Sequence, residues 1–249
     1  MSQTFQCTVD TYRQFDPASQ AGWQRQTLEF SRTNTAIVVM HAWQPPAPGD
    51  QPGWVRAVPY LTRARHILRQ AFPPLLTAVR TAGLPVFHIT GQTPEPTLNL
   101  PSIPTDSTWE SLRAFRDQHV FPGTENTTDF AAGLQKRTLA PEALPLENEA
   151  TAETNEALHR LCLQHQINHL IYVGFAINWC LLMSPGGMVE MKRYGYLCST
   201  VAEATAAVES RESSPLQGEY HQALWRTAVE FGFVFHDRDL IAALASTSR

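Results

Sequence analysis

Apolar residues gather in short continuous runs along this chain, separated by polar segments of irregular length. A continuous apolar run of about four to eight residues is typical of a strand covered on both faces of a parallel sheet. Such strands are predicted at residues 35–41, 84–89, 143–146, 168–173, 195–200 and 233–235. The run at 143–146 predicts only a short, weak strand, which would end in Glu147, Asn148 and Glu149.

Stretches with helical periodicity lie between these runs. Helices are predicted at residues 58–82, 107–118, 154–165, 219–231 and from 237, with a further helix after Cys180 that residues 184–187 break. Alternating strands and helices predict an α/β fold, a doubly wound and mostly parallel sheet with helices on both faces. Functional sites in such sheets lie at the carboxyl ends of the strands.

The chain has 249 residues, enough for one substantial α/β domain and few for two. We therefore expect a single domain over residues 1–249. Residues 1–33 lack a clean period and are interpreted as an N-terminal extension that packs on the domain. Residues 90–141 are polar and contain prolines, and they are interpreted as an insertion that shapes a site or a subunit contact.

Composition narrows the function classes. Hydrophobic residues make up 43%, charged residues 17%, and the net charge is −4, which favours a packed globule over a protein that coats nucleic acid. The chain has no apolar run of about 18 residues and no N-terminal signal pattern, so we expect a cytoplasmic protein with no membrane partner. Its four cysteines are irregularly spaced, which argues against a disulfide scaffold or a metal site of the CxxC type.

The stretch from Gly174 to Cys180 follows one of the predicted buried strands and leads directly into further apolar sequence. This pattern predicts a strand end that delivers a thiol to the start of a helix. N–H groups at a helix start favour a thiolate and can hold a developing oxyanion. The same pattern also fits a cysteine that packs as a small hydrophobe.

The order of residues from Gly174 to Cys180 resembles the glycine, small pair, threonine, asparagine, aromatic, cysteine signature of the isochorismatase-like cysteine hydrolases. Residues 35–40, 195–196 and 201–204 are similar to other segments of that family, and the resemblance covers about 35–244. The resemblance implies a Rossmann-like three-layer fold and hydrolysis of small amides, ureas or, without the cysteine, a vinyl ether. It also implies a homodimer or homotetramer and a catalytic aspartate, lysine and cysteine.

Only the cysteine of this set is preserved in kind. Alignment with the family places His41 at the aspartate position and Glu147 at the lysine position, with Glu149 as a close competitor. The hypothesis is a cysteine hydrolase that cleaves a small-molecule C–N bond through a variant triad. In it, Cys180 forms a thioester, His41 moves the proton and Glu147 orients His41.

The resemblance also implies a cis peptide bond after Ala176 that turns backbone amides toward the oxyanion, although Ile177 replaces the usual threonine there. The amides of Ile177 and Cys180 would then be the oxyanion donors.

The sequence gives weaker evidence that several other residues belong to the site. Trp43 and Trp179 flank two of the strand ends and would form either an aromatic pocket wall or plain packing. His88 ends a neighbouring strand and could approach the site. Arg113 and Arg116, in the predicted insertion, would either meet an anionic substrate or form a solvated face.

Alternatives to the triad remain open at this stage. His41 could be satisfied by a backbone carbonyl, and Glu147 could cap a helix or be solvated. No zinc-ligand spacing and no phosphate-binding glycine loop occur, so we expect no metal, no cofactor and no nucleic-acid partner, only a small-molecule substrate. The rival class is an inactive or ligand-binding member of the same fold. Ether hydrolysis is disfavoured, because it relies on the aspartate that His41 replaces.

Overall fold

The computed structural model describes residues 3–14, 21–91 and 103–246. Parts of the predicted N-terminal extension (1–2 and 15–20) and of the predicted insertion (92–102) therefore lie outside the described residues.

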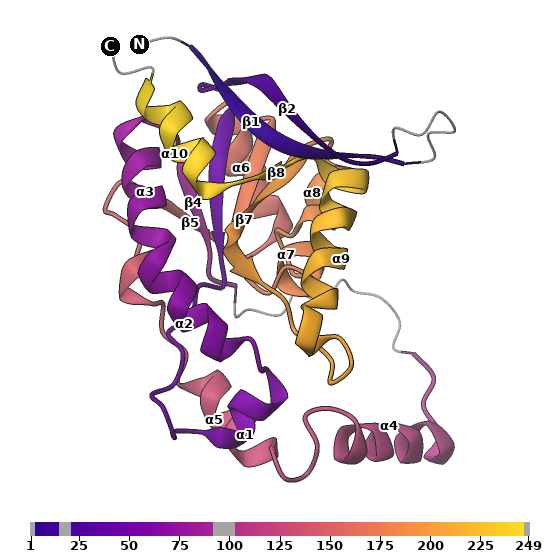
Figure 1. Cartoon of the computed structure of the whole chain (residues 1–249). Coiled ribbons are helices and arrows are strands. Elements are labelled where there is room, and N and C mark those ends of the chain that lie inside the picture. The colour runs from indigo at the N-terminus through magenta and orange to yellow at the C-terminus, as the bar shows by residue number, and fades with distance from the viewer. Residues whose placement is uncertain (1–2, 15–20, 92–102, 247–249) are drawn as a thin grey trace.

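Within the described ranges, eight strands form one sheet in the order β2-β1-β8-β7-β6-β3-β4-β5 (Figure 1). The strands are β1 (Thr4–Arg13), β2 (Gly22–Ser31), β3 (Thr35–Met40), β4 (Val86–Ile89), β5 (Ala150–Ala152), β6 (His169–Phe175), β7 (Leu197–Ala206) and β8 (Val234–Phe235). Strands β3 to β8 pair in parallel, and β1 joins β2 and β8 in antiparallel fashion.

The helices follow the strands in alternation, as the sequence predicts. They are α1 (Pro52–Ala57), α2 (Leu61–Gln70), α3 (Phe72–Thr81), α4 (Ser107–His119), α5 (Thr127–Gln135), α6 (Asn155–Gln164), α7 (Cys180–Met183), α8 (Met188–Arg193), α9 (Gly218–Arg226) and α10 (Asp237–Ser246). Short 3-10 turns cover Pro141–Ala143 and Ser214–Leu216, and a π-helical turn over Thr227–Phe231 continues α9. None of the described helices is long and apolar enough to span a bilayer.

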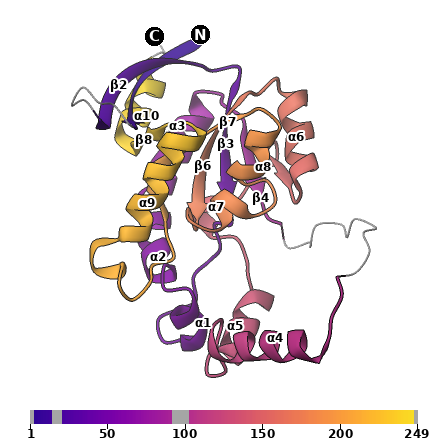
Figure 2. The ribbon, with the colours of Figure 1, turned by 90° about the vertical axis from the view of Figure 1, so that its right-hand side faces the viewer.

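The two faces of the sheet build two cores. In β3, Ile37 and Val39 face one layer, whereas Val38 and Met40 face the other, because successive side chains of a strand point to opposite faces. Helices α2, α3 and α10 cover the first face, and α6 to α9 cover the second (Figures 1 and 2). The predicted doubly wound, mostly parallel fold is therefore confirmed.

The N-terminal segment does more than pack on the domain. Strands β1 and β2 form a long antiparallel pair that extends the sheet beyond β8. Phe5, Cys7 and Val9 alternate with more exposed residues and enter the core. This two-residue period is typical of a strand with one buried face, so the interpretation of residues 1–33 as a segment without a clean period was wrong for β1.

The weak strand predicted at 143–146 is absent from the structure. Residues 141–143 form a 3-10 turn instead, and Leu144 and Leu146 are exposed. The strand that pairs with β4 is β5, which starts only at Ala150, because Ala150, Thr151 and Ala152 take the register beside Phe87, His88 and Ile89.

Helices α1 and α5 lie together beyond the carboxyl edge of the sheet (Figures 1 and 2). Gly133 of α5 allows this approach, because a Cβ there would lie 2.3 Å from the Trp54 ring of α1. The Gly53 N–H donates to the Asp129 carboxylate at 2.8 Å and Arg56 Nε donates to Asn126 Oδ1 at 2.9 Å. These contacts build one wall of the cavity described next.

Candidate active site

Cys180 stands where the sequence predicts, at the junction between β6 and α7. The strand ends at Phe175, four residues turn, and Cys180 is the first residue of α7 and is partly buried. The helix runs only to Met183 before Ser184, Pro185 and two glycines interrupt it, as predicted. The cis peptide bond joins Phe175 to Ala176, one residue earlier than the resemblance implied.

Gly174 is required at the end of β6 by its conformation and its surroundings. Its φ is +123°, and a Cβ there would lie 1.9 Å from the Met40 carbonyl oxygen of the adjacent strand. Its own carbonyl accepts a hydrogen bond from Thr205 Oγ1 at 2.7 Å. Glycine therefore lets the turn that carries Cys180 pass close to the end of β3, which His41 follows.

Asn178 fastens the turn to the segment that follows β7. Its amide Nδ2 donates to the Val208 carbonyl, and its Oδ1 accepts from the Val208 N–H, both at 2.9 Å. The asparagine of the signature thus has a positioning role.

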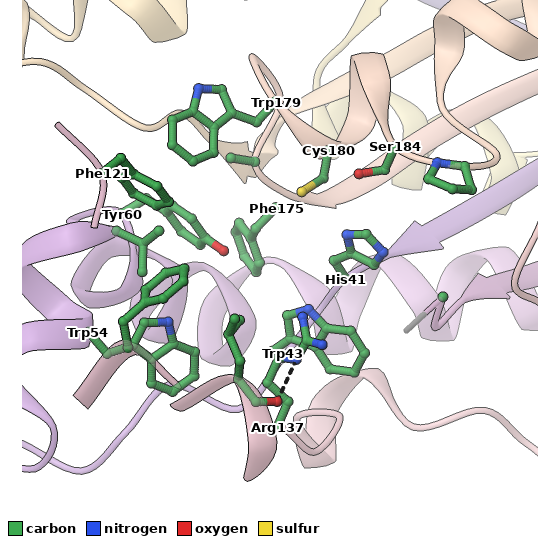
Figure 3. Close-up of a pocket in the computed structure, with 16 residues that line it drawn as sticks. His41, Trp43, Trp54, Tyr60, Phe121, Arg137, Phe175, Trp179, Cys180 and Ser184 are labelled. Atoms are coloured by element: carbon green, nitrogen blue, oxygen red, sulfur yellow. Dashed lines mark hydrogen bonds between the residues drawn. The ribbon is translucent and has the colours of Figure 1, made fainter. Parts of the chain in front are cut away.

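A cavity of about 590 Å³ opens beside Cys180 at the carboxyl edge of the sheet (Figure 3). The end of β3, the segment around α1, the α4–α5 region and the β6–α7 turn all contribute to its walls. Five residues predicted from the sequence line it, namely His41, Trp43, Ala176, Trp179 and Cys180. Figure 3 shows His41, Ser184 and Cys180 on one side and Trp54, Tyr60 and Phe121 on the other.

The predicted carboxylates lie elsewhere. Glu147 is exposed, and Glu149 binds Arg80 at 2.7 Å and His88 at 2.8 Å in a cleft at the amino end of β4. Both glutamates precede β5, whereas the cavity lies at the carboxyl ends of the strands. The error follows from the misplaced strand, and the structure does not bring Glu147 together with Cys180.

His88 does not reach the cavity either. Its ring is fully buried and its Nε2 bonds Glu149 Oε2. Burial lowers the pKa of His88, while the hydrogen bond and charge of Glu149 act in the opposite direction. Desolvation opposes ionisation of Glu149, but bonds from Arg80, the Leu146 N–H and His88 outweigh it and lower its pKa to about 2.

One of the two predicted oxyanion donors is already engaged. The Ile177 N–H donates to the Ala206 carbonyl at 2.9 Å, and the Ile177 side chain is buried in the core. By contrast, the N–H groups of Ala176 and Cys180 have no acceptor among the described residues. Because both residues line the cavity, these two amides are the available donors.

His41 follows β3 with a left-handed backbone (φ 50°) and stacks on Trp43 with ring centroids 5.6 Å apart. Burial, with a smaller contribution from the Arg137 charge, lowers the pKa of His41 to about 4. The imidazole is therefore neutral at pH 7 and able to accept a proton.

Sequence reasoning missed two polar residues of the cavity, Tyr60 and Arg137. Burial and the neighbouring Cys180 charge raise the pKa of Tyr60 well above its usual value, so its hydroxyl keeps its proton. In the structure both residues lie in irregular segments between elements, whereas the sequence placed Tyr60 at the start of the helix predicted over 58–82 and Arg137 in the predicted insertion. Arg113 of the predicted insertion is exposed and pairs with Asp117 on α4.

The ionisable side chains among the described lining residues are His41, Tyr60, Arg137 and Cys180. This set offers a thiol, a neutral imidazole, a phenol and one cation. No group of three or more His, Cys, Asp or Glu side chains in the described ranges is arranged so that it could hold a metal ion.

Fold and site together define a doubly wound α/β protein whose central strand presents a cysteine to an aromatic cavity. A model of the isochorismatase domain matches residues 51–235. The chain belongs to the isochorismatase family. Membership supports a hydrolase of small molecules.

The chain is also similar to solved structures, of which the first, with a TM-score above 0.5, shares its fold. A cysteine hydrolase from Pseudomonas syringae pv. phaseolicola 1448A shares 14% identity over 87% of this chain and 95% of its own, with a TM-score of 0.52. The MAR1 ribonuclease from Caenorhabditis elegans shares 13% identity over 88% and 85% of the two chains, with a TM-score of 0.49. The nicotinamidase from Staphylococcus aureus shares 12% identity over 81% and 98%, with a TM-score of 0.40. A search of curated proteins found no match.

Proposed function

We propose that this protein is a cysteine hydrolase that cleaves a C–N bond of a small amide, urea or carbamoyl compound through a Cys180 thioester. The observation that supports this most strongly is that a thiol, a neutral imidazole and two unpaired backbone N–H groups border one cavity. These are the nucleophile, the base and the oxyanion donors that acyl transfer to cysteine needs.

The reaction proceeds in two halves. His41 accepts the Cys180 proton as the sulfur attacks the carbonyl carbon, and the oxyanion rests on the N–H groups of Ala176 and Cys180. The C–N bond then breaks, the amine leaves with the proton that His41 returns, and the acyl group remains on sulfur as a thioester. Water, deprotonated by His41, releases the acid and restores the thiol.

His41 works in this scheme without a carboxylate partner. No aspartate or glutamate is among the described residues that line the cavity. Stacking on Trp43 holds the ring in place of the usual orienting hydrogen bond. The charge of Arg137 disfavours the His41 imidazolium, so the pair of Cys180 thiolate and His41 imidazolium forms only transiently. We therefore expect slower turnover than in a complete triad.

A ligand-binding role is the second candidate. The same lack of a lysine or carboxylate among the described cavity-lining residues favours it, because the two charged groups that the family resemblance implies are missing from this cavity. In that case the cavity would bind the same small molecules without turning them over.

Ammonia release from a panel of small primary amides, ureas and N-carbamoyl compounds tests the two functions. We expect turnover by the native protein, none by Cys180→Ala, and a loss of about 100-fold or more in His41→Ala. Cys7→Ala is the matched control, because Cys7 is buried in β1 within the hydrophobic core. Undiminished turnover by Cys180→Ala would exclude the thioester. A panel that binds but is never hydrolysed would favour the ligand-binding role.

A further inference from the structure

Arg137 is a cation that has no counterion among the described residues and that lines the same cavity as the proposed nucleophile. It is half-buried, and no ion pair involves it among the described residues. Its Nε donates to the Leu134 carbonyl at 3.0 Å, while neither terminal nitrogen has a hydrogen bond to the described chain. A partly desolvated guanidinium whose two terminal nitrogens lack hydrogen bonds can bind an anion.

The chain holds this arginine in a fixed place. The Gln44 N–H donates to the Thr138 carbonyl at 2.8 Å, and the Ala140 N–H donates to the Ala42 carbonyl at 2.9 Å. The guanidinium carbon lies 5.1 Å from the centre of the Trp43 ring, the same ring on which His41 stacks. Trp43 therefore contacts both the proposed base and the cation.

The remaining walls suit a flat apolar body. Phe121 meets Trp179 edge-on at 5.6 Å and Phe130 edge-on at 5.2 Å, and Tyr60 stacks on Phe175 at 5.8 Å. Aromatic side chains stack on planar groups, and these walls provide no cation that could pair with a second negative charge on a ligand. Arg137 is the single permanent cation among the described lining residues, so the cavity matches one negative charge rather than two.

We propose that the substrate is a monocarboxylate with a flat, mostly apolar body, whose carboxylate pairs with Arg137 while its scissile carbonyl lies at Cys180. This assignment rests on the proposed hydrolysis for the position of the carbonyl. The guanidinium fork matches a carboxylate with two parallel N–H···O bonds, and the apolar surroundings strengthen that pair. Arg137 is thus the residue that selects acids over their neutral analogues.

Calorimetric binding to the Cys180→Ala protein tests this selection without any catalysis. The probes are three acid–amide pairs: benzoate with benzamide, 3-phenylpropanoate with 3-phenylpropanamide, and 4-carbamoylbenzoate with terephthalamide. We expect at least one acid to bind about tenfold or more tightly than its amide. Adding Arg137→Gln should abolish that preference, and Arg137→Lys should retain part of it, because the charge stays but the fork is lost.

Arg113→Gln is the matched control, since Arg113 is equally cationic but lies exposed on α4. It should leave the acid preference unchanged. An acid preference that is equally strong in the Arg137→Gln and Arg113→Gln variants, or no acid binding at millimolar concentration, would overturn the assignment. Failure of the proposed hydrolysis is distinguishable from failure of this assignment. In the first case the native protein would hydrolyse no amide, but the binding of acids would still depend on Arg137.

Discussion

At the scale of single residues, the site depends on a histidine kept neutral by its surroundings. Burial, assisted by the charge of Arg137, lowers the pKa of His41 from its ordinary value to about 4. A lowered pKa means that the proton is lost more readily, so His41 remains a proton acceptor at every pH above about 4. An exposed histidine would lose that capacity near pH 6.5.

This shift predicts the acid limb of the pH profile. The kcat/KM for an amide substrate should stay level as pH falls through 6.5 and should decline only toward about 4. Near-ultraviolet circular dichroism at each pH identifies the range in which the fold is intact. A limb near 6.5 within that range would show that His41 is not the base, or that it is far less desolvated than the structure indicates.

Gly174 gives a prediction about stability. Gly174→Ala should cost more than about 3 kcal/mol of unfolding free energy, because the new Cβ would collide with the Met40 carbonyl at a positive φ. Gly195→Ala is the matched control, since its φ is also positive (+95°) but no atom lies within 4 Å of its Cβ position, and it should cost about 1–2 kcal/mol. Urea unfolding measures both. Equal losses would mean that β3 and β6 are not so closely apposed.

At the scale of elements, the long buried strands could be predicted from the sequence, whereas the short strand β5 could not. Buried strands such as 35–40 and 169–175 are continuous apolar runs, and the turn after the second carries a recognisable order of residues, so Cys180 and His41 could be placed. Strand β5 has only three residues, and its register is set by pairing with β4. The more apolar residues 143–146 were therefore predicted as the strand, and Glu147 and Glu149 were wrongly placed at its carboxyl end.

The β6–α7 turn supplies an element-scale prediction. Asn178→Ala removes two hydrogen bonds to Val208 and should cost about 1–3 kcal/mol, with a larger relative loss of turnover because the turn carries Cys180. Asn178→Asp keeps the acceptor for the Val208 N–H but turns a second carboxylate oxygen toward the Val208 carbonyl, so it should lose at least as much stability as Asn178→Ala. Urea unfolding and kcat are the two measurements. A variant with native stability and native kcat would show that the turn is held by other contacts.

At the scale of the whole molecule, the cavity is assembled from segments that are distant in sequence. Tyr60 and Arg137 come from irregular stretches before α2 and after α5, and only their tertiary contacts bring them beside Cys180. Neither could be assigned from the sequence, because no local pattern records a contact between residues so far apart. Trp43 and Trp179 could be assigned to the cavity from the sequence, because they adjoin predicted strand ends.

His236 joins three distant parts of the fold and predicts how stability depends on pH. Its ring bonds Glu203 of β7 at 2.7 Å and Asp10 of β1 at 2.9 Å, just before α10 begins. The bond to Glu203, followed by Asp10 and opposed by partial burial, raises the pKa of His236 to about 9. Because the folded state binds this proton more tightly, the stabilisation is complete below about 6.5 and is lost as pH rises through about 9.

The His236→Gln variant should therefore be less stable than the native protein at about pH 6, and the difference should shrink by about pH 10. Chemical unfolding at the two pH values measures it. A difference that stays constant or grows with pH would contradict the raised pKa.

The central claim, that Cys180 is a nucleophile activated by His41, is tested most directly by acylation with 4-nitrophenyl acetate and peptide mapping. We expect an acetyl thioester on Cys180 that forms faster than on any other cysteine and that forms much more slowly in His41→Gln. Burial raises the pKa of Cys7, Cys162 and Cys198 to about 12, so they should remain unmodified. No thioester on Cys180, or one that forms at the same rate in His41→Gln, would contradict the activation of Cys180 by His41.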